Sequence, residues 1–223
     1  MADEERTNIS MDPNEFMKRM KAIASDLWGG AVPAEEEAPA PAAQRPNPAE
    51  AAAEKQKTGI QSIWKTADET IDWTDALAHS TPTDGLTGPK MWAFYHKYAR
   101  RVLDGDIGAY TEVLQRANPL GELTEYAEGI TIQAPSAERL ESRFTCKAEL
   151  TEKNKKMYLA ALGLRIARDL LACLPAEEVA VTGEDGGKTV FAASYTRQQL
   201  LHRNFAFTDP VKLAEEIGAT FSL

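Results

Sequence analysis

The fold is decided by residues 152–174, EKNKKMYLAALGLRIARDLLACL. Large apolar side chains recur there at intervals of three and four residues, which is the pattern of one helical face: Leu159, Leu162, Ile166, Leu170 and Cys173. Their small and apolar neighbours widen that face to more than half of the helix circumference, which is typical of a helix covered on most sides. We therefore predict a buried core helix over residues 152–174, about 34 Å long.

Three charged residues occupy the remaining strip of this helix: Arg165, Arg168 and Asp169. Arginines at the edge of a buried helix need carboxylate or carbonyl partners, because an unpaired buried charge is costly. One interpretation is structural, with Arg165 paired to Asp169 four residues away and Arg168 paired to a carboxylate of a strand or loop. The alternative is functional, with Arg165 and Arg168 binding an anion.

Segments with strand patterns flank the predicted core helix on both sides. Before it, residues 130–134 and 140–148 alternate between apolar and polar side chains, which indicates a hairpin with one solvated face. After it, residues 178–182 and 189–195 flank the turn sequence GEDGGK, which indicates a second hairpin. A capping box at Thr196 and Gln199 and the pair Asp209–Pro210 each begin a further helix.

The segment that precedes these strands has helical patterns throughout. Two short helices are predicted at residues 60–67 and 71–77, a long one follows Pro89, and Asp106 caps another. We therefore expect an α+β domain over residues 58–223, in which a helical N-terminal half precedes a β-β-α-β-β-α order. The sheet is predicted to be mainly antiparallel, with the core helix on one face.

The most clearly amphipathic segment of the chain lies before this domain, at residues 12–28. Asp12 is a suitable N-cap, Pro13 suits the first helical position, and Gly29 and Gly30 end the pattern. The apolar side chains share one arc: Phe16, Met17, Met20, Ile23, Ala24, Leu27 and Trp28.

Residues 29–57 separate this amphipathic segment from the predicted domain, and they contain 10 Ala and 5 Pro in 29 positions. Such a composition buries too little apolar surface to offset the entropy of ordering. We predict three regions: a tail and docking helix at 1–28, a disordered linker at 29–57, and the domain at 58–223.

The composition argues against several classes of partner. A net charge of −9 and a pI near 5.0 disfavour binding to nucleic acid and to anionic membranes, since both would repel the chain. No run of 18 apolar residues occurs, so we expect no membrane span. The two cysteines form no CxxC pair, which is typical of a reduced, cytoplasmic protein.

Residues 105–120, 157–183 and 191–213 resemble parts of an uncharacterised bacterial domain family of unknown function, chiefly at the junction LRIARDLL-x-x-LP. The second hairpin is shorter here than in that family. The resemblance implies a bacterial source and no activity.

We expect no cofactor and no catalytic residues. We also expect no metal site, because Asp75 and His79 alone supply too few ligands for a structural metal. The function expected is that of a non-enzymatic interaction module whose N-terminal helix lies in a groove of a protein partner. Its expected partner-binding residues are Phe16, Met17, Met20, Ile23, Leu27 and Trp28. Two alternatives stay open for that helix: it folds back on its own domain or pairs with a second copy in a homodimer. A different class of function is also open, a small enzyme or anion-binding domain with a site near Arg165 and Arg168.

Overall fold

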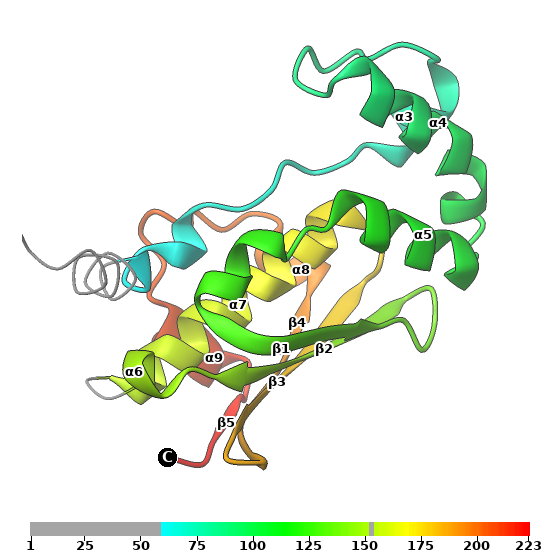
Figure 1. The fold of residues 1–223 in the computed structure, drawn as a ribbon. Coiled ribbons are helices and arrows are strands. Elements are labelled where there is room, and N and C mark those ends of the chain that lie inside the picture. The colour runs from blue at the N-terminus through cyan, green and yellow to red at the C-terminus, as the bar shows by residue number, and fades with distance from the viewer. Residues whose placement is uncertain (1–58, 152–153) are drawn as a thin grey trace, which may run out of the picture. The chain divides into compact units, whose positions relative to one another are not determined.

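The computed structural model describes residues 59–151 and 154–223, all of which belong to the second of the two units into which the chain divides, residues 46–223. The predicted docking helix with its partner-binding residues and the predicted linker lie outside the described residues. The described part is an α+β fold with a mixed five-stranded sheet (Figure 1).

The five strands follow one another across the sheet in chain order. They are β1 Ala127–Gln133, β2 Arg139–Cys146, β3 Glu178–Asp185, β4 Lys188–Thr196 and β5 Thr220–Phe221. The pairs β1–β2, β3–β4 and β4–β5 are antiparallel, whereas β2 and β3 are parallel. Gly186 and Gly187 form the β3–β4 turn with φ values of 55° and 75°, the left-handed conformations that a two-residue hairpin turn requires.

Most strand pairs are antiparallel, as predicted, but the sequence did not predict that β2 and β3 pair in parallel. Helix α7, Lys155–Cys173, follows β2 and precedes β3, so it carries the chain back to the end of the sheet at which β2 began. A strand that follows such a crossover runs parallel to its predecessor, and Leu140 of β2 accordingly pairs with Val179 of β3. Strand β5 was not predicted, because its two residues are too few to show a period.

Local sequence fixes both ends of α7. The side chain of Asn154 caps its first turn by accepting a hydrogen bond from the Met157 N–H at 3.0 Å. Leu174 is extended, at φ −128° and ψ 150°, as expected for a residue that precedes a proline. The predicted helix is therefore confirmed, with its start at residue 155.

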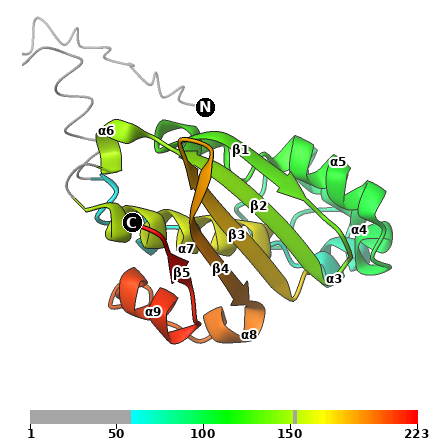
Figure 2. The same cartoon turned by 90° about the horizontal axis from the view of Figure 1, so that it is seen from below.

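Helix α7 is covered on most of its sides. It contacts β3 and β4 on one face of the sheet, and α5, α9 and the short helices η1 and α6 elsewhere (Figures 1 and 2). All its residues from Tyr158 to Ala167 are buried, which confirms the prediction of a core helix. Among the described helices, none combines the length and the apolar character needed to cross a lipid bilayer.

One glycine lets α7 lie close to the sheet. A Cβ atom on Gly163 would stand 2.5 Å from Cε1 of Phe191 on β4, nearer than two carbon atoms can approach. The position therefore admits only a hydrogen atom, and the aromatic ring of Phe191 fills the space that a side chain would take.

Three helices before β1 gather near one end of the sheet (Figures 1 and 2): α3 Trp73–Ala78, α4 Pro89–Leu103 and α5 Ile107–Ala117. The short helix η1, Ile63–Lys65, contacts α7, and η2, Gly121–Glu125, contacts β1. Asp106 caps α5 as predicted, and Asp72 caps α3. The indole N–H of Trp73 donates to the Cys173 carbonyl at 3.0 Å, which attaches α3 to the end of α7.

The remaining elements are short. Helix α6 is Ala148–Thr151, α8 is Arg197–Leu200 and α9 is Pro210–Glu216. Thr196 and Gln199 form the predicted capping box, and Asp209 caps α9.

Candidate functional site

The polar strip of α7 faces the extended segment that links η1 to α3. Arg165 donates from Nε to Oδ2 of Asp169 at 2.6 Å, and the two side chains are only 6% and 0% exposed. This is the internal ion pair that the spacing predicted. Because both charges are removed from water, each depends on the other for compensation.

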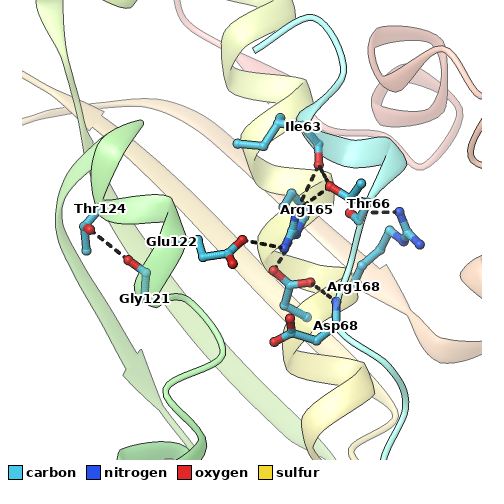
Figure 3. Close-up of polar contacts among 9 residues, drawn as sticks. Ile63, Thr66, Asp68, Gly121, Glu122, Thr124, Arg165 and Arg168 are labelled. Atoms are coloured by element: carbon cyan, nitrogen blue, oxygen red, sulfur yellow. Dashed lines mark hydrogen bonds and ion pairs between the residues drawn. The ribbon is translucent and has the colours of Figure 1, made fainter. Parts of the chain in front are cut away.

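Arg165 also holds the η1–α3 segment (Figure 3). Its Nη1 donates to Oγ1 of Thr66 at 2.8 Å and to the Ile63 carbonyl at 3.3 Å, while its Nη2 lies 3.8 Å from Oε2 of Glu122. From the other side, the backbone N–H of Asp68 donates to Asp169 at 3.0 Å. The pair therefore attaches this segment to the core helix.

Burial raises the pKa of Asp169 to about 6, although the nearby Arg165 guanidinium acts to lower it. The carboxyl is thus held in a site that disfavours its charge, and Arg165 supplies most of what keeps it ionised at neutral pH.

Arg168 has different partners from those predicted. Its Nη1 donates to the carbonyls of Trp64 and Thr66, and its guanidinium lies 3.7 Å from the ring centre of Phe205. The expectation of a strand or loop carboxylate was wrong, since backbone carbonyls and an aromatic face take that place. Burial lowers the pKa of the Arg168 guanidinium, although the nearby Asp169 carboxylate acts to raise it.

Arg168 lines a pocket of about 180 Å³ together with Arg197, and we call it the arginine pocket. The Arg197 guanidinium donates to the carbonyls of Leu171, Leu174 and Ala176 at 2.7–2.9 Å. Within the described ranges, neither arginine has a carboxylate at salt-bridge distance. The rest of the lining is mostly apolar, apart from Asp68 and Thr70.

Sequence reasoning identified Arg168 but missed Arg197. Arg197 is the first residue of the four-residue helix α8, and so short an element shows no period that would assign its residues to a face. Arg165, the other arginine named from the sequence, does not line the arginine pocket, because its donors point to Asp169 and the η1–α3 segment.

The histidines do not contribute to this pocket. Nδ1 of His79 lies 2.7 Å from Oδ1 of Asp75, and Nδ1 of His96 lies 2.7 Å from the Ala76 carbonyl oxygen. In the part of the chain that the structure describes, no three His, Cys, Asp or Glu side chains converge as a metal site would require. The arginine pocket therefore presents guanidinium groups and an aromatic ring, groups that can bind an anion.

Comparison of the chain with protein-family models, with curated proteins and with solved structures finds no match. The resemblance to an uncharacterised bacterial family, and the bacterial source that it implies, therefore stay predictions.

Proposed function

We propose that the protein is a cytoplasmic, non-enzymatic interaction module, in which the helix predicted at residues 12–28 binds a protein partner while residues 58–223 fold on their own. The observation that carries the proposal is the apolar arc of that helix, with Phe16, Met20, Ile23 and Leu27 as anchors and Met17 and Trp28 beside them. Anchors at this spacing fit the groove-binding mode of amphipathic helices.

The described domain supports the proposal because its core does not require that arc. The sheet and the described helices already surround α7, and its central residues are fully buried. An isolated helix of about 16 residues is marginal in water, so its apolar face needs a surface to cover it. The predicted linker of 29 residues would span about 30 Å, enough to reach a partner.

The test uses the double substitution Met20→Asp/Leu27→Asp in the full chain. We expect it to abolish co-purification with the partner from the native host while the melting temperature of the domain stays nearly unchanged. Ser25→Asp is the matched control, because it adds a negative charge on the predicted polar face of the same helix.

Two outcomes would contradict the proposal. A large fall in the melting temperature of the double variant would show that the helix is part of the domain. Unchanged co-purification would show that the apolar arc is not the interface. Sedimentation of the purified protein distinguishes a homodimer from binding to a different protein. If the helix pairs two copies of the chain, the double substitution abolishes self-association.

A second candidate function is anion binding in the arginine pocket. It is favoured by two half-buried guanidinium groups, Arg168 and Arg197, that share one pocket without a carboxylate partner among the described residues. Benzoate is a suitable probe, because its carboxylate can accept from arginine and its ring can lie beside Phe205. Arg168→Gln should weaken calorimetric binding of benzoate about tenfold, whereas Arg143→Gln, at an exposed arginine paired with Glu184, should leave it unchanged.

A further inference from the structure

The two arginines of the arginine pocket keep free donors after their contacts with the protein. Arg168 uses only Nη1, which donates to the carbonyls of Trp64 and Thr66, so its Nε–H and Nη2–H groups donate to no residue that the structure describes. Arg197 uses Nε and Nη2 and leaves Nη1. None of these nitrogens is among the buried side-chain atoms that lack a partner in the described ranges, so solvent and ligands can reach them.

The free edge of Arg168 fits one carboxylate. Nε and Nη2 of an arginine present two parallel N–H groups, the geometry in which a guanidinium binds both oxygens of a single carboxylate. The guanidinium is already held in place, since it lies 3.7 Å from the ring centre of Phe205 and donates to two carbonyls. A donor group that is held in this way loses little conformational entropy when a ligand binds.

The walls of the pocket beside these donors are mostly apolar. Leucine and alanine side chains of α7 and α8 and of the residue after α8 line it together with Phe205: Leu171, Ala172, Leu200 and Leu201. The pocket volume of about 180 Å³ is below the range of about 300–1,000 Å³ that is usual for small-molecule sites. The pocket therefore encloses the end of a ligand, a carboxylate and one apolar group, and leaves the rest outside.

The surroundings of the pocket favour a polypeptide as that ligand. Leu201, which lines the pocket, is 64% exposed, and Phe207 in the same loop is 88% exposed. A small acid would leave these side chains in water, whereas a longer chain can cover them. The η1–α3 segment also lines the pocket, and the backbone N–H groups of Ala67 and Thr70 donate to no described residue. They are therefore available to the backbone of a bound peptide.

The C-terminal residue of a peptide combines a carboxylate and an apolar side chain in the way that this pocket requires. Both groups leave the same Cα atom, so they can enter one small pocket while the chain continues outward. In an internal aspartate or glutamate the carboxylate lies at the end of its own side chain, and the nearest apolar group belongs to another residue. Capture of a C-terminal carboxylate is a recurring mode of peptide recognition.

We propose that the arginine pocket binds the C-terminus of a protein partner whose last residue has a branched aliphatic side chain, such as leucine. Arg168 binds the α-carboxylate with Nε and Nη2, and Arg197 adds a second positive charge. The aliphatic side chain packs against the leucines of the wall, and the preceding residues cover Leu201. The inference rests on the second candidate function, anion binding in this pocket, and is independent of the helix predicted at residues 12–28.

The test is calorimetric titration of the full chain with the acetylated peptide Ser-Gly-Val-Ala-Leu, which has a free C-terminus. We expect saturable binding of one peptide per chain and at least tenfold weaker binding of the same peptide with a C-terminal amide, because the amide lacks the charge that the guanidinium groups recognise. Glycine in place of the last leucine should weaken binding about tenfold, through loss of the buried aliphatic group. N-acetyl-leucine, which lacks the preceding residues, should bind about tenfold more weakly than the peptide.

Substitutions locate the bound carboxylate. Arg168→Gln should remove the preference for the free carboxylate over the amide, whereas a structural role of Arg168 alone would leave that preference intact. The control is Arg143→Gln, which removes the same charge from an exposed arginine outside the pocket and should leave the preference unchanged. If Arg168→Gln fails to fold, the comparison of the two peptides on the unsubstituted chain still decides.

Three results would overturn the inference. Equal affinity for the carboxylate and amide peptides would show that the C-terminus is not recognised. Equal affinity for N-acetyl-leucine and the peptide would show that the ligand is a small acid. Loss of the preference in Arg143→Gln would show attraction by overall charge. In each case, benzoate binding that depends on Arg168 would leave the anion site itself standing, whereas absence of binding by both benzoate and the peptide would refute the site as well.

Discussion

The ion pair between Arg165 and Asp169 joins the core helix to the segment that links η1 to α3. Arg165→Met should lower the free energy of unfolding by about 3–5 kcal/mol, since it leaves a buried carboxylate without counter-charge. In Arg165→Met/Asp169→Leu no buried charge remains, and the loss should be much smaller. Urea unfolding of the three proteins measures both values.

The decrease in the free energy of unfolding caused by Arg165→Met should also depend on pH. Arg165 lowers the pKa of Asp169, which is about 6 in the wild type, so removing Arg165 raises that pKa further. A carboxyl whose pKa is raised by folding destabilises the fold most when pH exceeds the folded-state pKa. The stability deficit of the variant should therefore be largest above its own Asp169 pKa and shrink as pH falls to about 6. A deficit that does not change with pH would show that Asp169 is not the group left uncompensated.

Two buried tyrosines allow a paired comparison. The hydroxyl of Tyr195 is fully buried and has no partner among the described residues, whereas the Tyr158 hydroxyl donates to the Tyr126 carbonyl at 2.7 Å. Tyr195→Phe should raise the free energy of unfolding by about 1 kcal/mol, because an unsatisfied polar group is removed. Tyr158→Phe should lower it by about 1–2 kcal/mol. Thermal melts in which both substitutions change the stability in the same direction would contradict this assignment.

At the scale of elements, the contact between α7 and β4 depends on Gly163. Gly163→Ala would improve helix propensity by about 1 kcal/mol, but its Cβ would stand 2.5 Å from Phe191. We expect the steric cost to prevail and the free energy of unfolding to fall by about 1–3 kcal/mol. The control is Gly108→Ala in α5, where the nearest atoms belong to the side chains of Asp106 and Arg101 and the change should stay within about 0.5 kcal/mol. Equal losses in the two variants would show that α7 does not pack as closely as described.

Elements that are specified by residues close together in the sequence could be predicted from the sequence. The apolar period of α7, the cap at Asp106 and the turn at Gly186–Gly187 are all local signals, and the structure confirms them. The parallel pairing of β2 with β3 could not be predicted in this way, because it depends on the path of the intervening helix. Strand β5 forms only because β4 offers it an edge.

The candidate sites show the same division. The pairing of Arg165 with Asp169 followed from a spacing of four residues, which brings side chains together on a helix. The partners of Arg168 come from residues about a hundred positions away, and no spacing reveals them. The arginine pocket brings together elements that are distant in sequence, so it could not be found before the fold was known.

At the scale of the whole molecule, charges are not evenly spread over the described surface. The open face of the sheet carries paired charges, such as Arg139 with Glu178 and Arg143 with Glu184. The arginine pocket instead holds two guanidinium groups that have no carboxylate at salt-bridge distance among the described residues. The described sheet and helices already surround α7, and we propose that the predicted amphipathic helix binds a partner.

The central claim is that residues 59–223 form a complete domain and that residues 1–58 serve binding instead of stability. Thermal unfolding of the full chain and of the fragment 59–223, under identical conditions, tests this most directly. We expect the two melting temperatures to agree within about 2 °C, because a difference of about 1 kcal/mol shifts a domain of this size by about 2–4 °C. A fragment that melts more than about 10 °C below the full chain would contradict the claim, since residues 1–58 would then contribute several kcal/mol to the fold.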